Sequence, residues 1–265
     1  MKDLGKTKFC LGLQIEHLVD GILLHQMAYT EKILKKFFMD QSHPLSSPMI
    51  VRSLDVKGPF RPRKNDEEVI GPEVPYLSAI GALMYLASHT RPDISFAVNL
   101  LARFSSCPTR RHWNGVKHIF RYLQGTKDMG LFFSNTCKED LIGFADAGYL
   151  SDPHTARSQT GYVFTCGGTA ISWRSMKQTL AATSSNHAEI LAIHEASREC
   201  VWLRSVVNTF EKIVVYNRKR KLQRLCMKIM LLASHNSRMG TSKETERSTF
   251  YRSFSSPMSY RRMAM

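Results

Sequence analysis

The clearest pattern of apolar and polar positions lies between residues 141 and 207. Three apolar or β-branched runs are separated by a polar stretch that contains Pro153 and by the pair Gly167-Gly168, both of which are typical of turns. The pattern predicts an antiparallel meander with strands at 141–147, 161–166 and 170–176 and a turn at 150–159.

A helix is predicted after the third strand, because Ser184 and Ser185 can cap its first turn and positions 190–204 keep roughly helical spacing. Asp146 stands at the end of the first strand, and Glu189 lies one turn inside the helix. Carboxylates placed in this way can converge on one point, and hard divalent cations are usually held by such oxygen ligands. Asp146 and Glu189 are therefore the candidate metal ligands and catalytic residues.

The first 133 residues predict other elements. Alternating apolar positions at 9–15, the pair Asp20-Gly21 and an apolar run at 21–26 predict a β-hairpin. Helices are predicted at 29–38, 76–87, 93–104 and 111–124. Residues 41–75 hold six prolines and a charged cluster, so we expect an extended, exposed and loosely ordered connector there.

Four ordered motifs resemble those of a known family. ADAGYLSD at 145–152 and SSNHAEILAI at 184–193 resemble SDADWAGD and SSTEAEYIAL of the ribonuclease H domain in Ty1/copia-type retrotransposon Pol polyproteins. TGYVF from Thr160 and ISWRSMKQ from Ile171 match the same domain. The resemblance implies that Asp146 and Glu189 bind Mg²⁺ and that the domain cuts the RNA strand of an RNA–DNA hybrid, recognised through minor-groove 2′-hydroxyls. Two acidic residues of the family motifs are replaced by Gly148 and His187, which removes negative charge near the site.

The preceding residues resemble the reverse transcriptase of the same polyproteins. MKDLG, FCLGLQIE, the segment from Tyr76 that includes HTRPD at 89–93, and RYLQGT follow in the family's order. The family's polymerase carboxylates lie in a YVDD-type strand that precedes MKDLG, and no Asp-Asp pair follows a Tyr here, so we predict no polymerase chemistry. HTRPD is interpreted as a helix-breaking turn, with Arg91 as a candidate contact for a backbone phosphate.

The net charge of +15 is unevenly distributed. Residues 1–207 carry 24 Lys and Arg against 19 Asp and Glu, whereas residues 208–265 carry 13 against 3. Such a basic block is typical of a disordered extension or of an arm that binds nucleic acid.

The basic tail has a further interpretation in the genetic code. If each codon begins one nucleotide earlier, the tail can encode a string similar to the continuation of the ribonuclease H domain, including a YEDN segment. The bases for the Asp of that segment are divided between the codons of Lys228 and Ile229. We infer a single-nucleotide frame change close to Val207, or an error in the gene model or sequence read that yields the same protein string.

Catalysis is expected to be absent or very weak. Two-metal hydrolysis needs several carboxylates to hold cations about 3.5–4 Å apart, and the resemblance makes the Asp of YEDN the third acid. Glu195, Glu199 and Asp152 are interpreted as residues of solvated faces, not as substitutes. The alternatives are a non-enzymatic fragment that binds nucleic acid through its Lys and Arg residues, chiefly those of the tail, and a product of a decayed element without selected function.

Other candidate sites are weaker. None of the six cysteines forms a C-x-x-C pair, and the histidines at 112, 118, 187 and 194 lack metal-site spacing, so structural roles are expected. No signal peptide and no span long enough for a membrane are recognised, so we expect a cytoplasmic or nuclear protein that is not secreted.

The predicted fold class is α+β, with a palm and thumb remnant followed by an incomplete ribonuclease H-like mixed sheet. Its parts are a reverse transcriptase hairpin and helix (1–40), the connector (41–75), a helical thumb or connection segment (76–133), a partial ribonuclease H-like domain (134–207) and a disordered, out-of-frame tail (208–265). The rest of the Pol polyprotein is expected to be missing.

Overall fold

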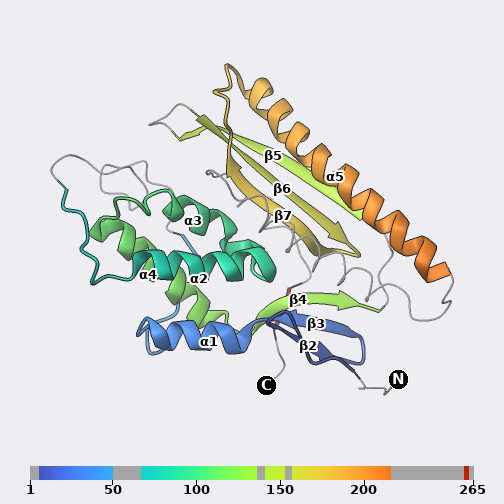
Figure 1. Ribbon diagram of the computed structural model, residues 1–265, viewed down its shortest axis with the longest axis horizontal. Coiled ribbons are helices and arrows are strands. Elements are labelled where there is room, and N and C mark those ends of the chain that lie inside the picture. The colour runs from blue at the N-terminus through green and yellow to red at the C-terminus, as the bar shows by residue number, and fades with distance from the viewer. Residues whose placement is uncertain (1–5, 50–66, 136–140, 153–156, 216–259, 263–265) are drawn as a thin grey trace.

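The computed structural model describes residues 6–49, 67–135, 141–152, 157–215 and 260–262. Within these ranges the chain forms five helices and two antiparallel sheets, which confirms the predicted α+β class (Figure 1).

The first sheet has the strand order β1-β2-β3-β4-β8. Its strands are β1 (Phe9–Cys10), β2 (Leu13–His17), β3 (Gly21–His25), β4 (Met129–Ser134) and β8 (Tyr260–Arg262). The predicted hairpin is confirmed by the pairing of β2 with β3. The expected single strand at 9–15 is wrong, because Leu11 and Gly12 both have positive φ and turn β1 back onto β2.

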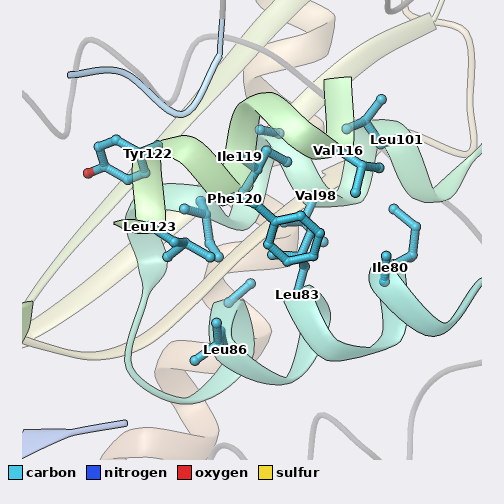
Figure 2. Close-up of a cluster of buried hydrophobic side chains, with 14 of the residues drawn as sticks. Ile80, Leu83, Leu86, Val98, Leu101, Val116, Ile119, Phe120, Tyr122 and Leu123 are labelled. Carbon is cyan, nitrogen blue, oxygen red and sulfur yellow. The ribbon is translucent and has the colours of Figure 1, made fainter. Parts of the chain in front are cut away.

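The helical part confirms the predicted helices to within a few residues. It contains α1 (Met27–Lys36), α2 (Tyr76–His89), α3 (Pro92–Ala102) and α4 (Arg110–Gly125). Figure 2 shows apolar side chains of α2, α3 and α4 pointing toward one another, among them Leu83, Leu101 and Phe120, which are fully buried. Burial of large apolar side chains, each worth about 1.5–3 kcal/mol, holds these helices together.

The described parts of the connector are more ordered than the sequence predicts. His118 Nε2 donates to the carbonyl of Ser47 at 3.0 Å, and Arg121 Nε donates to that of His43 at 2.8 Å. In the later part of the connector, Glu67 accepts hydrogen bonds from Arg111 Nη2 at both of its carboxylate oxygens. Residues 41–49 and 67–75 therefore lie fastened to α4, while 50–66 lie outside the described residues.

The second sheet confirms the predicted meander. It has the order β5-β6-β7, formed by β5 (Leu141–Asp152), β6 (Arg157–Cys166) and β7 (Thr169–Lys177). Gly167 and Gly168 turn the chain with positive φ, as expected. The predicted turn at 150–159 is too long, because β5 continues through an irregularity after Gly148 and Leu150 donates its N–H to Ser158 Oγ.

The described parts of the tail form regular secondary structure. Helix α5 (Ser185–Val215) continues past Val207, and β8 pairs with β4. The expected disorder is therefore wrong for 208–215 and 260–262, and residues 216–259 lie outside the described part of the chain.

The two sheets share one hydrophobic cluster. It joins buried residues of β2, β3 and β4 to those of β6, β7 and α5, including Leu131, Val163 and Leu203. Trp173 Nε1 of β7 also donates to the carbonyl of Ala87 in α2 at 2.8 Å. The second sheet lies between α5 and the helices α2–α4 (Figure 1).

No helix within the described ranges is both long and apolar enough to cross a membrane.

Candidate carboxylate site

Asp146 lies in β5, the edge strand of the second sheet, directly opposite Gly161 of β6. Its side chain is half-buried. The next residue, Ala147, is buried and faces a cluster of small side chains that includes Ala188 and Ala192 of α5. Because alanines present little bulk, the first turns of α5 can approach the edge strand closely.

Glu189 is brought to this strand by the start of α5. Ser184 caps the helix as predicted, because its Oγ accepts the N–H of His187 at 3.1 Å. His187 Nδ1 in turn accepts a hydrogen bond from the N–H of Thr183 at 3.3 Å. His187 therefore has a role at the helix cap, which agrees with the structural role expected for it.

The two predicted carboxylates lie near enough in the folded chain for their charges to interact. Partial burial raises the pKa of Glu189, the negative charge of Asp146 raises it further, and a hydrogen bond from the Ala147 N–H acts in the opposite direction. Asp146 and Glu189 therefore form a local concentration of negative charge. The Glu189 carboxylate is hydrogen-bonded to the backbone of the edge strand β5.

Such a pair fits part of a ligand set for a hard divalent cation, which prefers carboxylate oxygens. In the described part of the chain, no group of three or more His, Cys, Asp or Glu residues is placed to hold a metal ion. Glu195 lies 3.7 Å from Arg198, and Glu199 Oε1 accepts a hydrogen bond from Ser172 at 2.6 Å. Glu199 is thus held against β7 and not on a solvated face, and the Asp152 side chain lies outside the described residues.

Gln178, directly after β7, was not singled out from the sequence. Its side chain is 5% exposed, and its Nε2 donates to Thr160 Oγ1 at 3.1 Å and to the carbonyl of Ala188 at 2.8 Å. The available signal was its place at the end of the ISWRSMKQ motif, which marks the residue without indicating its partners.

The interpretation of Arg91 as a phosphate contact is wrong. Arg91 is 2% exposed, and its guanidinium donates to both carboxylate oxygens of Asp93 and to the carbonyl and hydroxyl of Thr126. Tyr122 donates its hydroxyl to the same carboxylate at 2.8 Å. HTRPD is thus a helix-breaking turn, as predicted, with its arginine turned inward.

Another of the predicted structural histidines, His112, also has defined contacts. His112 is fully buried, stacks on Phe104 with 4.0 Å between ring centroids, and accepts the N–H of Thr109 at the start of α4. These contacts complete a capping box at the helix N-terminus.

The chain is similar to transposon polyproteins. It is 39% identical over 206 residues to the retrovirus-related Pol polyprotein from transposon TNT 1-94 of Nicotiana tabacum, a match that covers 77% of this chain and 15% of that protein. It is 33% identical over 207 residues to the Pol polyprotein from transposon RE2 of Arabidopsis thaliana, with 78% and 14% covered. The chain thus spans a small part of the length of these two relatives.

A third relative is the secreted RxLR effector protein 161 of Plasmopara viticola, 46% identical over 130 residues, which are 49% of this chain and 92% of that protein. No protein-family model and no solved structure matches the chain.

Proposed function

The chain belongs to the Ty1/copia-type retrotransposon Pol polyproteins, and we propose that β5, β6, β7 and α5 are the first half of a ribonuclease H domain with an incomplete metal site. Its proposed ancestral reaction is cleavage of the RNA strand of an RNA–DNA hybrid. In this chain we expect that reaction to be absent or very weak.

The observation that carries the proposal is the convergence of Asp146 and Glu189 at the edge of β5. These two carboxylates would hold Mg²⁺, which when bound activates water and stabilises the leaving oxygen in phosphodiester hydrolysis. Asp146 supplies a charge at the strand, and Glu189 is oriented by the N–H of Ala147. Their arrangement supports weak cation binding at a site where the described residues offer too few carboxylates for two ions.

Three observations support loss of the reaction. Gly148 and His187 stand where the family motifs have acids, so the neighbourhood has lost negative charge. By family resemblance and the inferred frame change, the third acid would be encoded across the codons of Lys228 and Ile229. The matches to these two polyproteins cover 206 and 207 residues, about the length of the segment before the inferred frame change near Val207.

The test is cleavage of a labelled RNA–DNA hybrid by the full chain in Mg²⁺, with Asp146→Asn as the matched control. We expect both proteins to give the same background rate. A rate in the parent chain that is clearly above that of Asp146→Asn would contradict the proposal. A frame-restored chain that carries the YEDN segment should gain Asp146-dependent cleavage, because it regains the third acid.

Non-enzymatic binding of nucleic acid is the second candidate function, favoured by the excess of 13 Lys and Arg over 3 Asp and Glu in residues 208–265. Such binding should weaken steeply with salt, because phosphate contacts release counterions. Replacing Arg218, Lys219, Arg220 and Lys221 by Gln should reduce both the affinity for a single strand or hybrid and the salt slope. Unchanged affinity would remove the tail from this role.

We place the chain in a reducing compartment, the cytoplasm or nucleus. Among the described residues, cysteines 10, 107, 166 and 200 form no disulfide, which suits such a compartment. The relation to a protein named a secreted effector makes location worth testing directly, and recovery of the tagged chain from the culture medium would contradict this placement.

A further inference from the structure

We propose that Gln178 is a positioning residue that sets the approach of the Asp146 and Glu189 carboxylates by joining β6 to the first turns of α5. The effect of Gln178 on cation binding rests on the proposed function. The positioning itself stands on the contacts of the folded chain.

Gln178 is fixed at both its backbone and its side chain. Its N–H donates to the carbonyl of Ser158 in β6 at 2.9 Å, which extends the pairing of β6 with β7 by one residue. Its side-chain Nε2 uses both hydrogens, one toward Thr160 Oγ1 and one toward the carbonyl of Ala188. The amide therefore bridges a strand and a helix from a buried, anchored position.

These two bonds connect to the carboxylates through neighbouring residues. Thr160 pairs directly with Ala147, the residue after Asp146, across β5 and β6. Ala188 is the residue before Glu189, and the Glu189 carboxylate accepts the N–H of Ala147. The contacts thus form a closed circuit that runs from Ala147 through Thr160, Gln178 and Ala188 to Glu189 and back.

The circuit is needed because other forces here are weak or opposed. The like charges of Asp146 and Glu189 repel each other, which favours movement of α5 away from the edge of β5. The side chains packed between strand and helix are largely alanines, which bury little apolar surface. Directional hydrogen bonds from Gln178 therefore have a large share in holding this end of α5.

Gln159 offers a matched control for the effects of altering any buried amide. It is 1% exposed, and its Nε2 donates to Ser175 Oγ at 2.6 Å, so it joins β6 to β7 within the sheet. In both Gln159 and Gln178 the Oε1 atom has no hydrogen-bond partner among the described residues. The two differ in that only the Gln178 bonds reach the helix that carries Glu189.

The test compares Gln178→Met with Gln159→Met in the full chain, since Met keeps the approximate volume and removes the donors. The first readout is the pKa of Glu189, followed by NMR of carboxyl-labelled glutamate and assigned with Glu189→Gln. We expect Gln178→Met to lower this pKa toward its ordinary value of 4.5, as Glu189 moves away from Asp146 and into solvent. Gln159→Met should leave it unchanged.

The second readout is Mn²⁺ binding, measured by paramagnetic broadening of the same carboxyl signals. Substitution of a residue that orients a metal ligand typically lowers metal affinity about 10–100-fold. We therefore expect Gln178→Met to weaken Mn²⁺ binding about tenfold or more. No binding to the parent chain would defeat the proposed cation site and leave the pKa comparison intact.

An unchanged Glu189 pKa in Gln178→Met, or an equal change in Gln159→Met, would overturn the positioning role. If Gln178→Met does not fold, Thr160→Val replaces it, because it removes one acceptor of the same amide and retains the shape. It should shift the Glu189 pKa in the same direction by a smaller amount, and no shift would likewise overturn the proposal.

Discussion

Arg91 shows how a single buried charge can stabilise this fold. Its guanidinium links the turn between α2 and α3 to the end of α4, where it meets Thr126 and lies 5.5 Å from the ring of Tyr122. The carboxylate of its partner Asp93 is itself only 13% exposed. Removal of the guanidinium would leave this carboxylate buried without its counter-charge.

We predict that Arg91→Met lowers the free energy of unfolding by about 3–5 kcal/mol, the usual cost of removing one partner of a buried ion pair. Urea titration followed by circular dichroism measures this loss. Arg110→Met, at an exposed arginine of α4, should change stability by no more than about 0.5 kcal/mol. Equal effects of the two variants would refute a stabilising role for the buried ion pair.

His25 makes the stability depend on pH. The side chain is fully buried in β3, and this burial lowers its pKa below 6.5, although Glu16 at 3.3 Å acts in the opposite direction. Folding therefore favours the neutral imidazole. The resulting stabilisation is present above pH about 6.5 and is lost as the pH falls through 6.5 toward the lower folded value, because only the unfolded chain gains the proton readily.

We expect the unfolding free energy of the parent chain to fall between about pH 7.5 and 5.5 more steeply than that of His25→Gln. Urea titrations of both proteins across this range give the comparison. His118, whose pKa is also lowered by burial, is present in both and cancels. Parallel pH dependence would show that His25 does not contribute.

At the residue scale, the sequence identified candidate residues better than it identified their surroundings. Asp146 and Glu189 were recognisable because their residue types and spacing matched motifs, and in the folded chain the charge of Asp146 acts on Glu189. The environments of Arg91 and Gln178 were not predictable, because both residues bond to partners that are distant in the sequence. Arg91 contacts Thr126, 35 residues away, and Gln178 contacts Ala188, 10 residues away.

At the scale of elements, strong local signals gave correct results. Ser184 caps the start of α5, and Gly167-Gly168 forms the turn between β6 and β7, because capping hydroxyls and positive φ act within a few residues. β4 was missed because its short apolar run becomes a strand through pairing with β3, where Leu24 lies opposite Leu131 and Ile22 opposite Phe133.

Helix α1 is terminated by a residue with left-handed backbone geometry, which glycine adopts most easily, but the residue at this position is Phe38. The N–H groups of Phe38 and Met39 bond the carbonyls of Lys35 and Leu34, which is the Schellman pattern of helix ends. Phe38 has a φ of 56° and is 91% exposed. Its side chain therefore adds backbone strain with almost no burial.

We predict that Phe38→Gly raises the free energy of unfolding by about 0.5–1 kcal/mol, because glycine adopts left-handed φ without the strain imposed by a side chain. Urea titration measures the gain. Phe38→Ala keeps a Cβ and should give little of it. An equal gain from Ala would attribute the effect to removal of the aromatic ring.

At the scale of the whole molecule, the parts assigned from the sequence are physically joined. The boundary between residues 133 and 134 was drawn from family resemblance. The hydrophobic cluster shared by the two sheets crosses it, because this cluster contains Leu13 and Phe133 as well as Leu203. The first sheet also needs β4, which reaches it from beyond α4, and β4 meets β7 where Thr169 donates to the carbonyl of Phe132. Both sides of that boundary thus depend on shared contacts.

We therefore predict a single cooperative unfolding transition for the chain. Its three tryptophans report on both clusters, since Trp113 lies in the helical one and Trp173 and Trp202 border the other. Incorporation of 5-fluorotryptophan gives each a separate ¹⁹F signal without any substitution, and the native signals should disappear at the same urea concentration. If Trp113 kept its native signal after the other two were lost, the helical cluster would fold independently, and the boundary at 133 would also be a boundary in folding.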